Sequence, residues 1–245
     1  MTVLITGGAR GIGRMTAELL LEAGRSVIVL DRDISALAEL RERDGLTAVE
    51  GDATNVDLLQ SVCLDAGLTG VVASAGISRP GPSLNYPVQD WNEIIAVNLT
   101  AVFDTMRVAA ESAQPGASFV AISSVTAHQG FAGRAAYAAS KAGVEAVVRT
   151  LAVELAPRIR VNAVAPGFIM TDIARENISR GVIDSAQIRA RTPLGRWGQP
   201  IDVARSIRFL LDDDSSWVTG STITVDGGWL SYGALGTPGE PSLSL

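Results

Sequence analysis

The sequence of 245 residues has little of the side chains on which several kinds of functional site depend. Its one cysteine, Cys63, excludes an intramolecular disulfide framework, and a single histidine, His128, leaves no Cys/His set for a structural zinc site. We therefore expect no metal in this protein. A reducing compartment, the cytoplasm, fits this composition best.

Positive charge and long apolar runs are also scarce. The 20 basic residues are outnumbered by 26 acidic ones, so no excess of positive charge exists to follow a nucleic-acid backbone. No run of about 18 apolar residues could span a bilayer. The first residues lack the basic start and long apolar region of a secretion signal. These absences argue against nucleic acid and membrane as partners and favour a small-molecule substrate.

Apolar residues and glycine are plentiful, with 47% hydrophobic residues and 25 glycines. Short apolar segments alternate with longer amphipathic ones, which predicts an α/β fold with a mostly parallel sheet between two helical layers. The predicted strands are Val3–Thr6, Ser26–Asp31, Thr47–Glu50, Gly70–Ser74, Ser118–Ser123, Arg160–Ala165 and Thr222–Val225. The predicted helices are Gly11–Ala23, Ser35–Arg43, Val56–Asp65, Val88–Ser112, Ala135–Leu155 and Ile201–Leu211.

Residues 1–232 are predicted to form a single domain, because no repeat and no interior linker divides them. Residues 233–245 are rich in Gly, Pro and Ser and are predicted to be a C-terminal tail. The stretch 169–196 interrupts the alternation of strands and helices just after a strand end, so we expect it to cover a ligand site. A surface excursion of two short helices is the alternative.

A glycine-rich turn joins the first predicted strand to the first helix, in the run Thr6-Gly7-Gly8-Ala9-Arg10-Gly11-Ile12-Gly13. Backbone without Cβ atoms lets a pyrophosphate approach, and a helix N-terminus offers it unpaired N–H groups. Because the pattern lies between a strand and a helix at the start of a βαβ unit, it is a strong indication of a dinucleotide site. The predicted cofactor contacts are Gly7, Arg10, Gly11, Ile12 and Gly13.

An acidic residue, Asp31, ends the second predicted strand, 24 residues after Gly7. A carboxylate there is expected to bind the adenosine ribose hydroxyls and to repel a 2′-phosphate, which favours NAD over NADP. Arg10 and Arg32 keep NADP open, because either could pair with a phosphate. As solvated surface charges they would have no such role.

Tyr137 and Lys141 stand four residues apart, on one face of a predicted helix. A neighbouring cation stabilises a phenolate, so it lowers a tyrosine pKa from about 10 toward a range useful for proton transfer. Ser124, 13 residues upstream of Tyr137, ends a predicted strand and completes a plausible proton-transfer unit.

Together these segments resemble the short-chain dehydrogenase/reductase family, from Val3 to about Gly228. The resemblance rests on Gly7-x-x-x-Gly11-x-Gly13, Asp31, Asp52-Ala53, Asn98, Ser124, Tyr137-x-x-x-Lys141 and Pro166-Gly167. It implies a doubly wound, Rossmann-type domain with a seven-stranded parallel sheet, one nicotinamide cofactor per subunit, and a dimer or tetramer. The long helices expected at Val88–Ser112 and Ala135–Leu155 carry apolar residues beyond one face, so we expect a homotetramer built as a dimer of dimers.

By this resemblance Tyr137 is the general acid/base, and Ser124 hydrogen-bonds the same substrate oxygen. Lys141 binds the nicotinamide ribose and lowers the pKa of Tyr137. Asn98 holds a water in a proton relay; a buried amide at a helix irregularity is the alternative. Such hydride transfer requires no metal.

The resemblance assigns further cofactor contacts: Arg32, the adenine-binding pair Asp52 and Ala53, the ribose neighbours Ala75 and Gly76, Tyr137 and Lys141, and the carboxamide segment of Pro166, Gly167, Ile169 and Thr171. A helix N-cap is the alternative for Thr171. One departure stands out. Ala73-Ser74-Ala75-Gly76 replaces the family's Asn-Asn-Ala-Gly, so an asparagine that tethers strands is missing.

The loops that set substrate specificity in the family contain a polar mixture with only two aromatic residues, Phe131 and Phe168. That mixture suits a polyol, sugar or hydroxy acid better than a steroid. The candidate substrate residues are Ser78, Thr126, Arg134 and Phe168. We therefore expect an NAD(H)-dependent oxidoreductase that interconverts a secondary alcohol and a ketone.

Two alternatives remain. The first is an NADPH-dependent 3-oxoacyl-thioester (acyl-carrier-protein) reductase. The run from Tyr137 to Gly143 and the closing Thr224-Val225-Asp226-Gly227-Gly228 resemble such enzymes. Because those enzymes generally use NADPH, Asp31 opposes this alternative. A non-catalytic nucleotide sensor on the same fold is the other, and the presence of Asn98, Ser124, Tyr137 and Lys141 opposes it.

Overall fold

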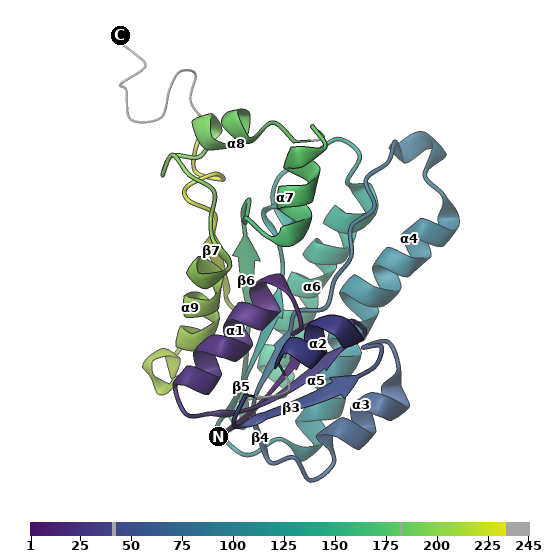
Figure 1. Ribbon diagram of the computed structural model, residues 1–245. Coiled ribbons are helices and arrows are strands. Elements are labelled where there is room, and N and C mark those ends of the chain that lie inside the picture. Colours follow the sequence, from purple (N-terminus) through teal and green to yellow (C-terminus); the bar gives the residue numbers. More distant parts are fainter. Residues whose placement is uncertain (41–42, 182, 234–245) are drawn as a thin grey trace.

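A seven-stranded, wholly parallel sheet organises the computed structural model, which describes residues 1–40, 43–181 and 183–233. The strand order is β3-β2-β1-β4-β5-β6-β7 (Figure 1). The predicted doubly wound α/β fold is therefore confirmed. The strands are β1 Thr2–Thr6, β2 Ser26–Asp31, β3 Leu46–Glu50, β4 Leu68–Ala73, β5 Ala117–Ile122, β6 Ile159–Pro166 and β7 Thr222–Val225.

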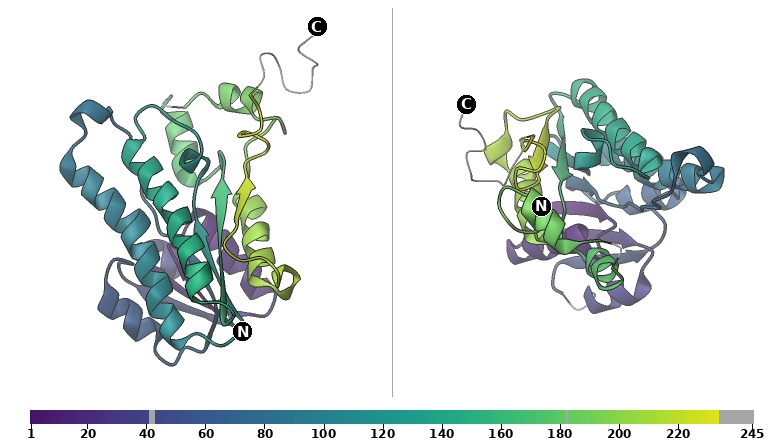
Figure 2. Two further views of the ribbon diagram at one scale, coloured as in Figure 1. Left: turned by 180° about the vertical axis from the view of Figure 1, so that it is seen from behind. Right: turned by 90° about the horizontal axis from the view of Figure 1, so that it is seen from above.

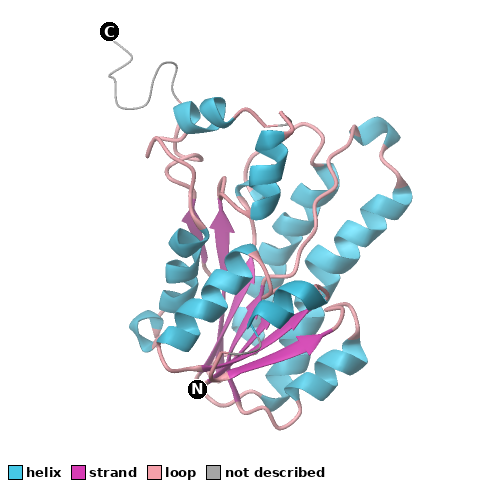
Figure 3. Cartoon of the chain, viewed as in Figure 1, coloured by secondary structure: helices cyan, strands magenta, loops and turns pink. Residues whose placement is uncertain are grey.

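Helices cover both faces of this sheet (Figure 3). One core lies between the sheet and α3, α5 and α6, with Leu59, Met106 and Val148 among its buried residues. The other lies under α1, α2 and α9, with Leu20, Leu37 and Ile207. The helices are α1 Gly11–Glu22, α2 Ile34–Leu40, α3 Val56–Cys63, α4 Val88–Ile95, α5 Ala101–Ser112, α6 Ala135–Glu154, α7 Asp172–Ser179, α8 Ser185–Arg191 and α9 Pro200–Leu211.

The site is positioned by the direction of the strands. Because all of them are parallel, their carboxyl ends meet at one edge, and the strand order reverses there between β1 and β4. Open α/β sheets bind their ligands outside this switch point. Helices α7 and α8 lie beyond the same edge, as Figure 1 and the view from above in Figure 2 show. The predicted covering stretch 169–196 thus contains two short helices, which was the alternative expectation.

One helix prediction is wrong in its continuity. The expected helix Val88–Ser112 is broken by a π-helical turn at Ala96–Thr100, which separates α4 from α5. Such turns are rare and are frequent at functional sites. The helix predicted to reach Arg43 ends at Leu40, with residues 41 and 42 outside the described part, as are residues 234–245 of the predicted tail. No helix among the described residues is long and apolar enough to cross a membrane.

Candidate active site

The glycine-rich loop forms a cradle of bare backbone at the start of α1. A Cβ atom on Gly13 would lie 2.2 Å from the carbonyl oxygen of Gly7, and one on Gly7 would lie 2.6 Å from Cα of Ala75. Gly7 and Gly11 have φ angles of 68° and 54°, which glycine adopts without strain. Since only glycine fits and the helix N-terminus faces this loop, the cradle fits a pyrophosphate. Ile12 is partly buried in the first turn of α1.

Asp31 ties the end of β2 to this loop. Its Oδ2 accepts a hydrogen bond from the backbone N–H of Ala9 at 3.0 Å, and its Oδ1 accepts one from that of Asp33 at 3.0 Å. A carboxylate oxygen accepts more than one hydrogen bond, so both oxygens can still receive a ribose hydroxyl. The carboxylate is thus held in place beside the cradle.

Both arginines that kept NADP open have carboxylate partners. Arg10 forms an ion pair with Asp33, and the hydrogen bond from Arg10 holds the pKa of Asp33 well below its usual range. Arg32 pairs with Asp52 at 3.3 Å. Three carboxylates, those of Asp31, Asp33 and Asp52, therefore gather around the ends of β2 and β3. Arg10 and Arg32 balance two of these charges.

Asp52 and Ala53 follow β3. The Oδ1 of Asp52 accepts hydrogen bonds from the backbone N–H and the hydroxyl of Thr54, each at 2.9 Å. The Ala53 side chain is buried. The loop that carries both residues is therefore fixed locally, next to Arg32.

Asn98, in the π-helical turn, holds the chain that leaves β4. Its Oδ1 accepts a hydrogen bond from the N–H of Ile77 at 2.8 Å, and its Nδ2 donates to the carbonyl of Ile77 at 2.9 Å. A Cβ on Gly76 would lie 3.5 Å from Asn98 Oδ1 and 3.6 Å from Lys141 Nζ. The fold thus brings Gly76, Asn98 and Lys141 together. The buried amide serves the Ile77 backbone rather than its own helix.

The missing family asparagine leaves a backbone tether in place. The N–H of Ser74 donates to the carbonyl of Thr6 at 3.1 Å, so the ends of β4 and β1 remain joined. Together with the two bonds from Asn98 to Ile77, this fixes the chain on both sides of Ala75 and Gly76.

Ser124 and Tyr137 meet beyond the end of β5. Ser124 is buried, its Oγ accepts from the N–H of Thr126 at 3.2 Å, and its side chain lies near the Tyr137 hydroxyl. Burial raises the pKa of Tyr137 above 10, against the opposing effects of the Ser124 side chain and the Arg134 charge. The cation that lowers this pKa is Arg134, and the effect expected of Lys141 stays a prediction.

Lys141 lies one helical turn beyond Tyr137 on α6 and is 3% exposed. Its Nζ donates to the carbonyl of Ile122 at 2.8 Å and lies 5.7 Å from the centre of the Tyr137 ring. Burial lowers the pKa of Lys141 to about 8. The ammonium therefore connects the end of β5 to the space beside Gly76.

The segment after β6 faces the glycine cradle. A Cβ on Gly11 would lie 3.5 Å from Cγ2 of Thr171, and one on Gly167, next to Pro166, would lie 2.8 Å from Cα of Asp226. Thr171 is the N-cap of α7, with its Oγ1 accepting from the N–H of Ala174 at 3.3 Å. Its hydroxyl hydrogen is still available to a ligand. Ile169 forms a parallel bridge with Gly198.

Comparison with known proteins identifies this arrangement. A family model described as enoyl-(acyl carrier protein) reductase matches residues 7–230. The 3-oxoacyl-[acyl-carrier-protein] reductase FabG of Thermotoga maritima is 41% identical over 238 residues, which are 92% of this chain and 96% of that protein. The chain belongs to the short-chain dehydrogenase/reductase family. It is therefore an oxidoreductase of CH–OH groups that uses a nicotinamide dinucleotide, NAD or NADP.

Two other matches carry the family name. An uncharacterized short-chain type dehydrogenase/reductase of Sinorhizobium fredii, y4vI, is 36% identical over 243 residues, which are 94% of this chain but only 43% of that protein. The crystal structure of a short-chain dehydrogenase/reductase, glucose/ribitol dehydrogenase, from Brucella melitensis matches with a TM-score of 0.88 and 33% identity. It covers 95% of this chain and 97% of that one.

In this short-chain dehydrogenase/reductase the chain's only lysine, Lys141, is a buried cation. The folded pKa of about 8 lies below the ordinary 10.5, so the charged form is disfavoured by folding. We expect Lys141→Met to raise the free energy of unfolding at pH 7 by about 1–3 kcal/mol. Urea denaturation of both proteins measures this difference.

The pH dependence of that difference has a definite sign. Between pH 8 and 10.5 the unfolded wild type binds more protons than the folded one, so its stability rises with pH relative to Lys141→Met. The advantage of the variant should therefore shrink from pH 7 to pH 10. A difference that stays constant over this range would contradict the buried, depressed pKa.

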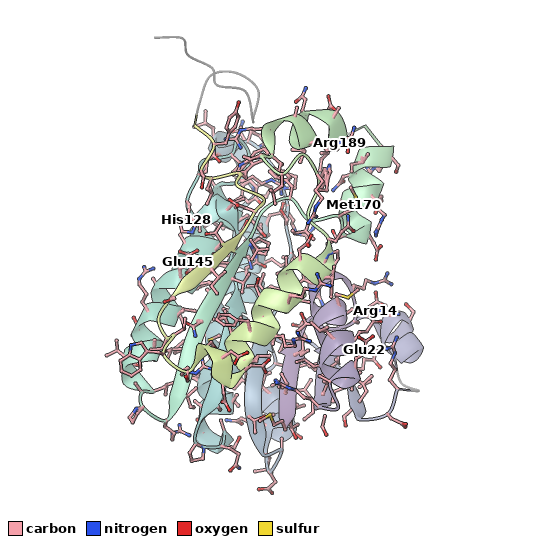
Figure 4. All side chains as sticks on the ribbon, turned by 90° about the vertical axis from the view of Figure 1, so that its left-hand side faces the viewer. Arg14, Glu22, His128, Glu145, Met170 and Arg189 are labelled. Atoms are coloured by element: carbon pink, nitrogen blue, oxygen red, sulfur yellow. The ribbon has the colours of Figure 1, made fainter. Side chains whose placement is uncertain are left out.

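Sequence reasoning missed a buried network behind Ser124. Glu145, on α6, accepts a hydrogen bond from the Ser123 hydroxyl at 2.7 Å and faces His128 at 2.9 Å (Figure 4). Ser123 also donates to the carbonyl of Lys141 at 3.3 Å. The network joins β5 to α6 next to Ser124. Only the spacing of four residues from Lys141 to Glu145 could have indicated it.

The predicted substrate residues lie along the loops around Ser124. Arg134 Nη1 donates to the Ser78 hydroxyl, and the Gly81 N–H donates to the Gly133 carbonyl at 3.0 Å, so the loops after β4 and β5 run together. Thr126 Oγ1 is buried, with no hydrogen-bond partner among the described residues. That hydroxyl is available to a ligand.

The two aromatic residues predicted in the substrate loops have further aromatic neighbours in the structure. Phe131 and Phe168 pack with two tryptophans from distant segments, Trp197 and Trp229. Their ring centres lie 4.4 to 6.3 Å apart. Trp197 and Trp229 lie outside the substrate loops and reach the cluster from beyond α8 and β7. The site therefore has an aromatic wall beside its polar groups.

A cavity of about 260 Å³ lies near this wall but away from Tyr137. It is lined by Phe168, Ile169, Thr192, Leu194, Arg196, Gly198, Asp202, Val225, Asp226 and Gly227. None of the four predicted catalytic residues lines it. In the described part of the chain no group of three or more His, Cys, Asp or Glu side chains could hold a metal ion.

Proposed function

We propose that this protein is an NAD(H)-dependent dehydrogenase that interconverts a secondary alcohol and a ketone on a polar small molecule. The observation that carries the proposal is the meeting of Ser124 and Tyr137 with Lys141, Asn98 and Gly76 at the ends of β4 and β5. These are the residue types and the place at which the family carries out proton transfer.

The residues that would hold the dinucleotide follow from the cradle and its surroundings. The backbone around Gly7, Arg10, Gly11, Ile12 and Gly13 would hold the pyrophosphate, and Asp31 the adenosine ribose. Once bound, the nicotinamide accepts or supplies the hydride, which is the redox part of the reaction. The remaining contacts would come from Arg32, Asp52, Ala53, Ala75, Gly76, Tyr137, Lys141, Pro166, Gly167, Ile169 and Thr171.

The chain's own residues would handle the proton. In reduction Tyr137 donates its hydroxyl proton to the carbonyl oxygen of the substrate, which Ser124 holds by a second hydrogen bond. A pKa above 10 keeps the Tyr137 phenol protonated near neutral pH, ready for this donation. Lys141 would bind the nicotinamide ribose. Asn98 would hold the β4 loop and a relay water beside Lys141.

The preference for NAD is supported by Asp31, whose carboxylate is held beside the glycine cradle at the end of β2. We expect Asp31→Asn to shift the ratio of kcat/KM values for NADP⁺ and NAD⁺ toward NADP⁺ by about 10- to 100-fold, because a charge repelling the 2′-phosphate is lost. Steady-state kinetics with both cofactors measures the ratio. The exposed Asp44, in the turn before β3, provides a control with the same change of net charge, Asp44→Asn. A wild type that prefers NADP⁺ would refute the preference.

The polar substrate is supported by Ser78, Thr126 and Arg134 and agrees with the sugar and polyol named for the Brucella melitensis structure. A screen of polyols, sugars and hydroxy acids with NAD⁺, followed by NADH absorbance, tests the proposal. Turnover of none of these classes would refute it.

The Thermotoga maritima relative favours a second candidate, a 3-oxoacyl-thioester reductase. Faster turnover of a 3-oxoacyl thioester with NADPH than of any polar alcohol with NAD⁺ would favour this second candidate.

We also propose a dimer of dimers in the cytoplasm. Exposed apolar side chains on α5 and α6, Phe103 and Val153, support assembly through these helices.

A further inference from the structure

Arg191, the last residue of α8, has an unusual environment. Its guanidinium carbon lies 3.8 Å from the centre of the Trp229 ring. Its Nη1 is buried and has no hydrogen-bond partner in the part of the chain that the structure describes. Three other arginines near it in sequence, by contrast, pair with carboxylates: Arg175 with Asp172, Arg180 with Glu176 and Arg196 with Asp202.

A buried guanidinium N–H without an acceptor is unfavourable. Leaving one hydrogen-bonding group of a charged side chain unsatisfied costs the full desolvation penalty of that group. The Trp229 ring stabilises the cation through its face, but a ring face does not replace an acceptor in the plane of the guanidinium. An acceptor supplied by a ligand would remove this cost.

Trp229 connects Arg191 to the catalytic loop. The indole Nε1 donates to Gln129 Oε1 at 2.9 Å, and the ring stacks on Phe131 with centres 6.3 Å apart. Gln129 and Phe131 belong to the loop between Ser124 and Tyr137. On its other side Trp229 contacts Phe168, with ring centres 4.4 Å apart. Arg191 therefore lies on the aromatic wall, which the loops around Ser124 and Gly167 share.

We propose that Arg191 binds the carboxylate of the substrate, so that the substrate class is a hydroxy acid and its oxo acid. The inference rests on the proposed function and selects among the polyol, sugar and hydroxy acid that it leaves open. A planar guanidinium held against an indole presents its N–H groups edge-on, the geometry in which arginine binds a carboxylate with two hydrogen bonds. Trp229 fixes that plane.

The test compares each acid with a neutral analogue of similar size. Two such pairs are used: 3-hydroxybutyrate with 3-hydroxybutanamide, and galactonate with galactitol. The wild type should use the acid of at least one pair with a higher kcat/KM than its neutral partner. In Arg191→Met that value should fall by about 10- to 100-fold, mainly through KM, as loss of a hydrogen bond to a charged group predicts. The neutral compound should be unaffected.

Two further variants separate binding from folding. Arg189 lies two residues earlier on α8 and is exposed (Figure 4). Because residues two apart on a helix do not face the same way, Arg189→Met makes the same change of charge on another face of α8. It should leave both members of each pair unchanged. Arg191→Lys keeps the charge without the planar fork, and should restore part of the lost affinity. Thermal unfolding of all three variants checks that the fold is intact.

Calorimetric titration decides the case without turnover. With NADH bound, a hydroxy acid cannot react, so its dissociation constant can be measured for wild type and Arg191→Met. The Arg191 site is overturned if Arg191→Met loses as much affinity for the amide as for the acid, or if the wild type prefers neither acid over its neutral partner. Either result leaves the dehydrogenase proposal standing. If no compound of either class is oxidised with NAD⁺, the proposed function fails. The titration then still decides whether Arg191 binds a carboxylate.

Discussion

Replacing Tyr137 with phenylalanine is expected to lower kcat by about 10²- to 10⁴-fold, the usual contribution of a positioned acid or base. The variant keeps the ring and loses only the hydroxyl that lies near Ser124. Binding of NADH, followed by fluorescence, should change little, because the ring and Lys141 remain. Turnover and cofactor binding are thus expected to separate in this variant.

Tyr86→Phe is the matched control. The Tyr86 hydroxyl donates to the carbonyl of Arg79, outside the proposed catalytic set, so its removal should alter kcat by less than about twofold. Unchanged turnover in Tyr137→Phe would contradict the proposed proton donor and would revive the nucleotide-sensing alternative.

The second large effect is expected at the cradle. Gly13→Ala places a Cβ atom 2.2 Å from the carbonyl oxygen of Gly7, well inside contact distance, and both atoms belong to backbone that has little room to move. We expect NADH affinity to fall by at least about 100-fold, because the turn must open where the pyrophosphate approaches. Fluorescence titration with NADH measures this loss.

A second glycine provides the comparison. A Cβ on Gly233 would meet nothing within 4 Å, so Gly233→Ala should bind NADH like the wild type. Near-normal binding in Gly13→Ala, with an unchanged unfolding temperature, would show that the cradle tolerates a side chain and does not approach the cofactor.

The parts of this protein that could be predicted from sequence are those encoded over short distances. The turn from Gly7 to Gly13 lies between adjacent elements, and its strand, turn and helix all appear in the structure. The pair Tyr137 and Lys141 lies on one helix, so its spacing alone placed both side chains on one face.

The missed features depend on partners far away in the chain. The π-helical turn brings Asn98 to Ile77, 21 residues earlier, and nothing in the local pattern of Val88–Ser112 signals a break. Trp229 reaches Gln129 across 100 residues, so a count of aromatic residues in single loops could not include it. The pKa of Tyr137 also depended on packing, because burial outweighs its charged neighbours.

Lys141 has a consequence for chemical labelling. It is the only lysine, and every other basic residue is an arginine or His128, so Nζ of Lys141 is the one side-chain amine of the sequence. With a pKa of about 8, a substantial fraction of the Lys141 amine is neutral and nucleophilic in mildly alkaline buffer. An amine-directed crosslinker, dye or immobilisation surface therefore finds no lysine outside the candidate active site. Among the side chains it can react only with Lys141, inside the candidate active site.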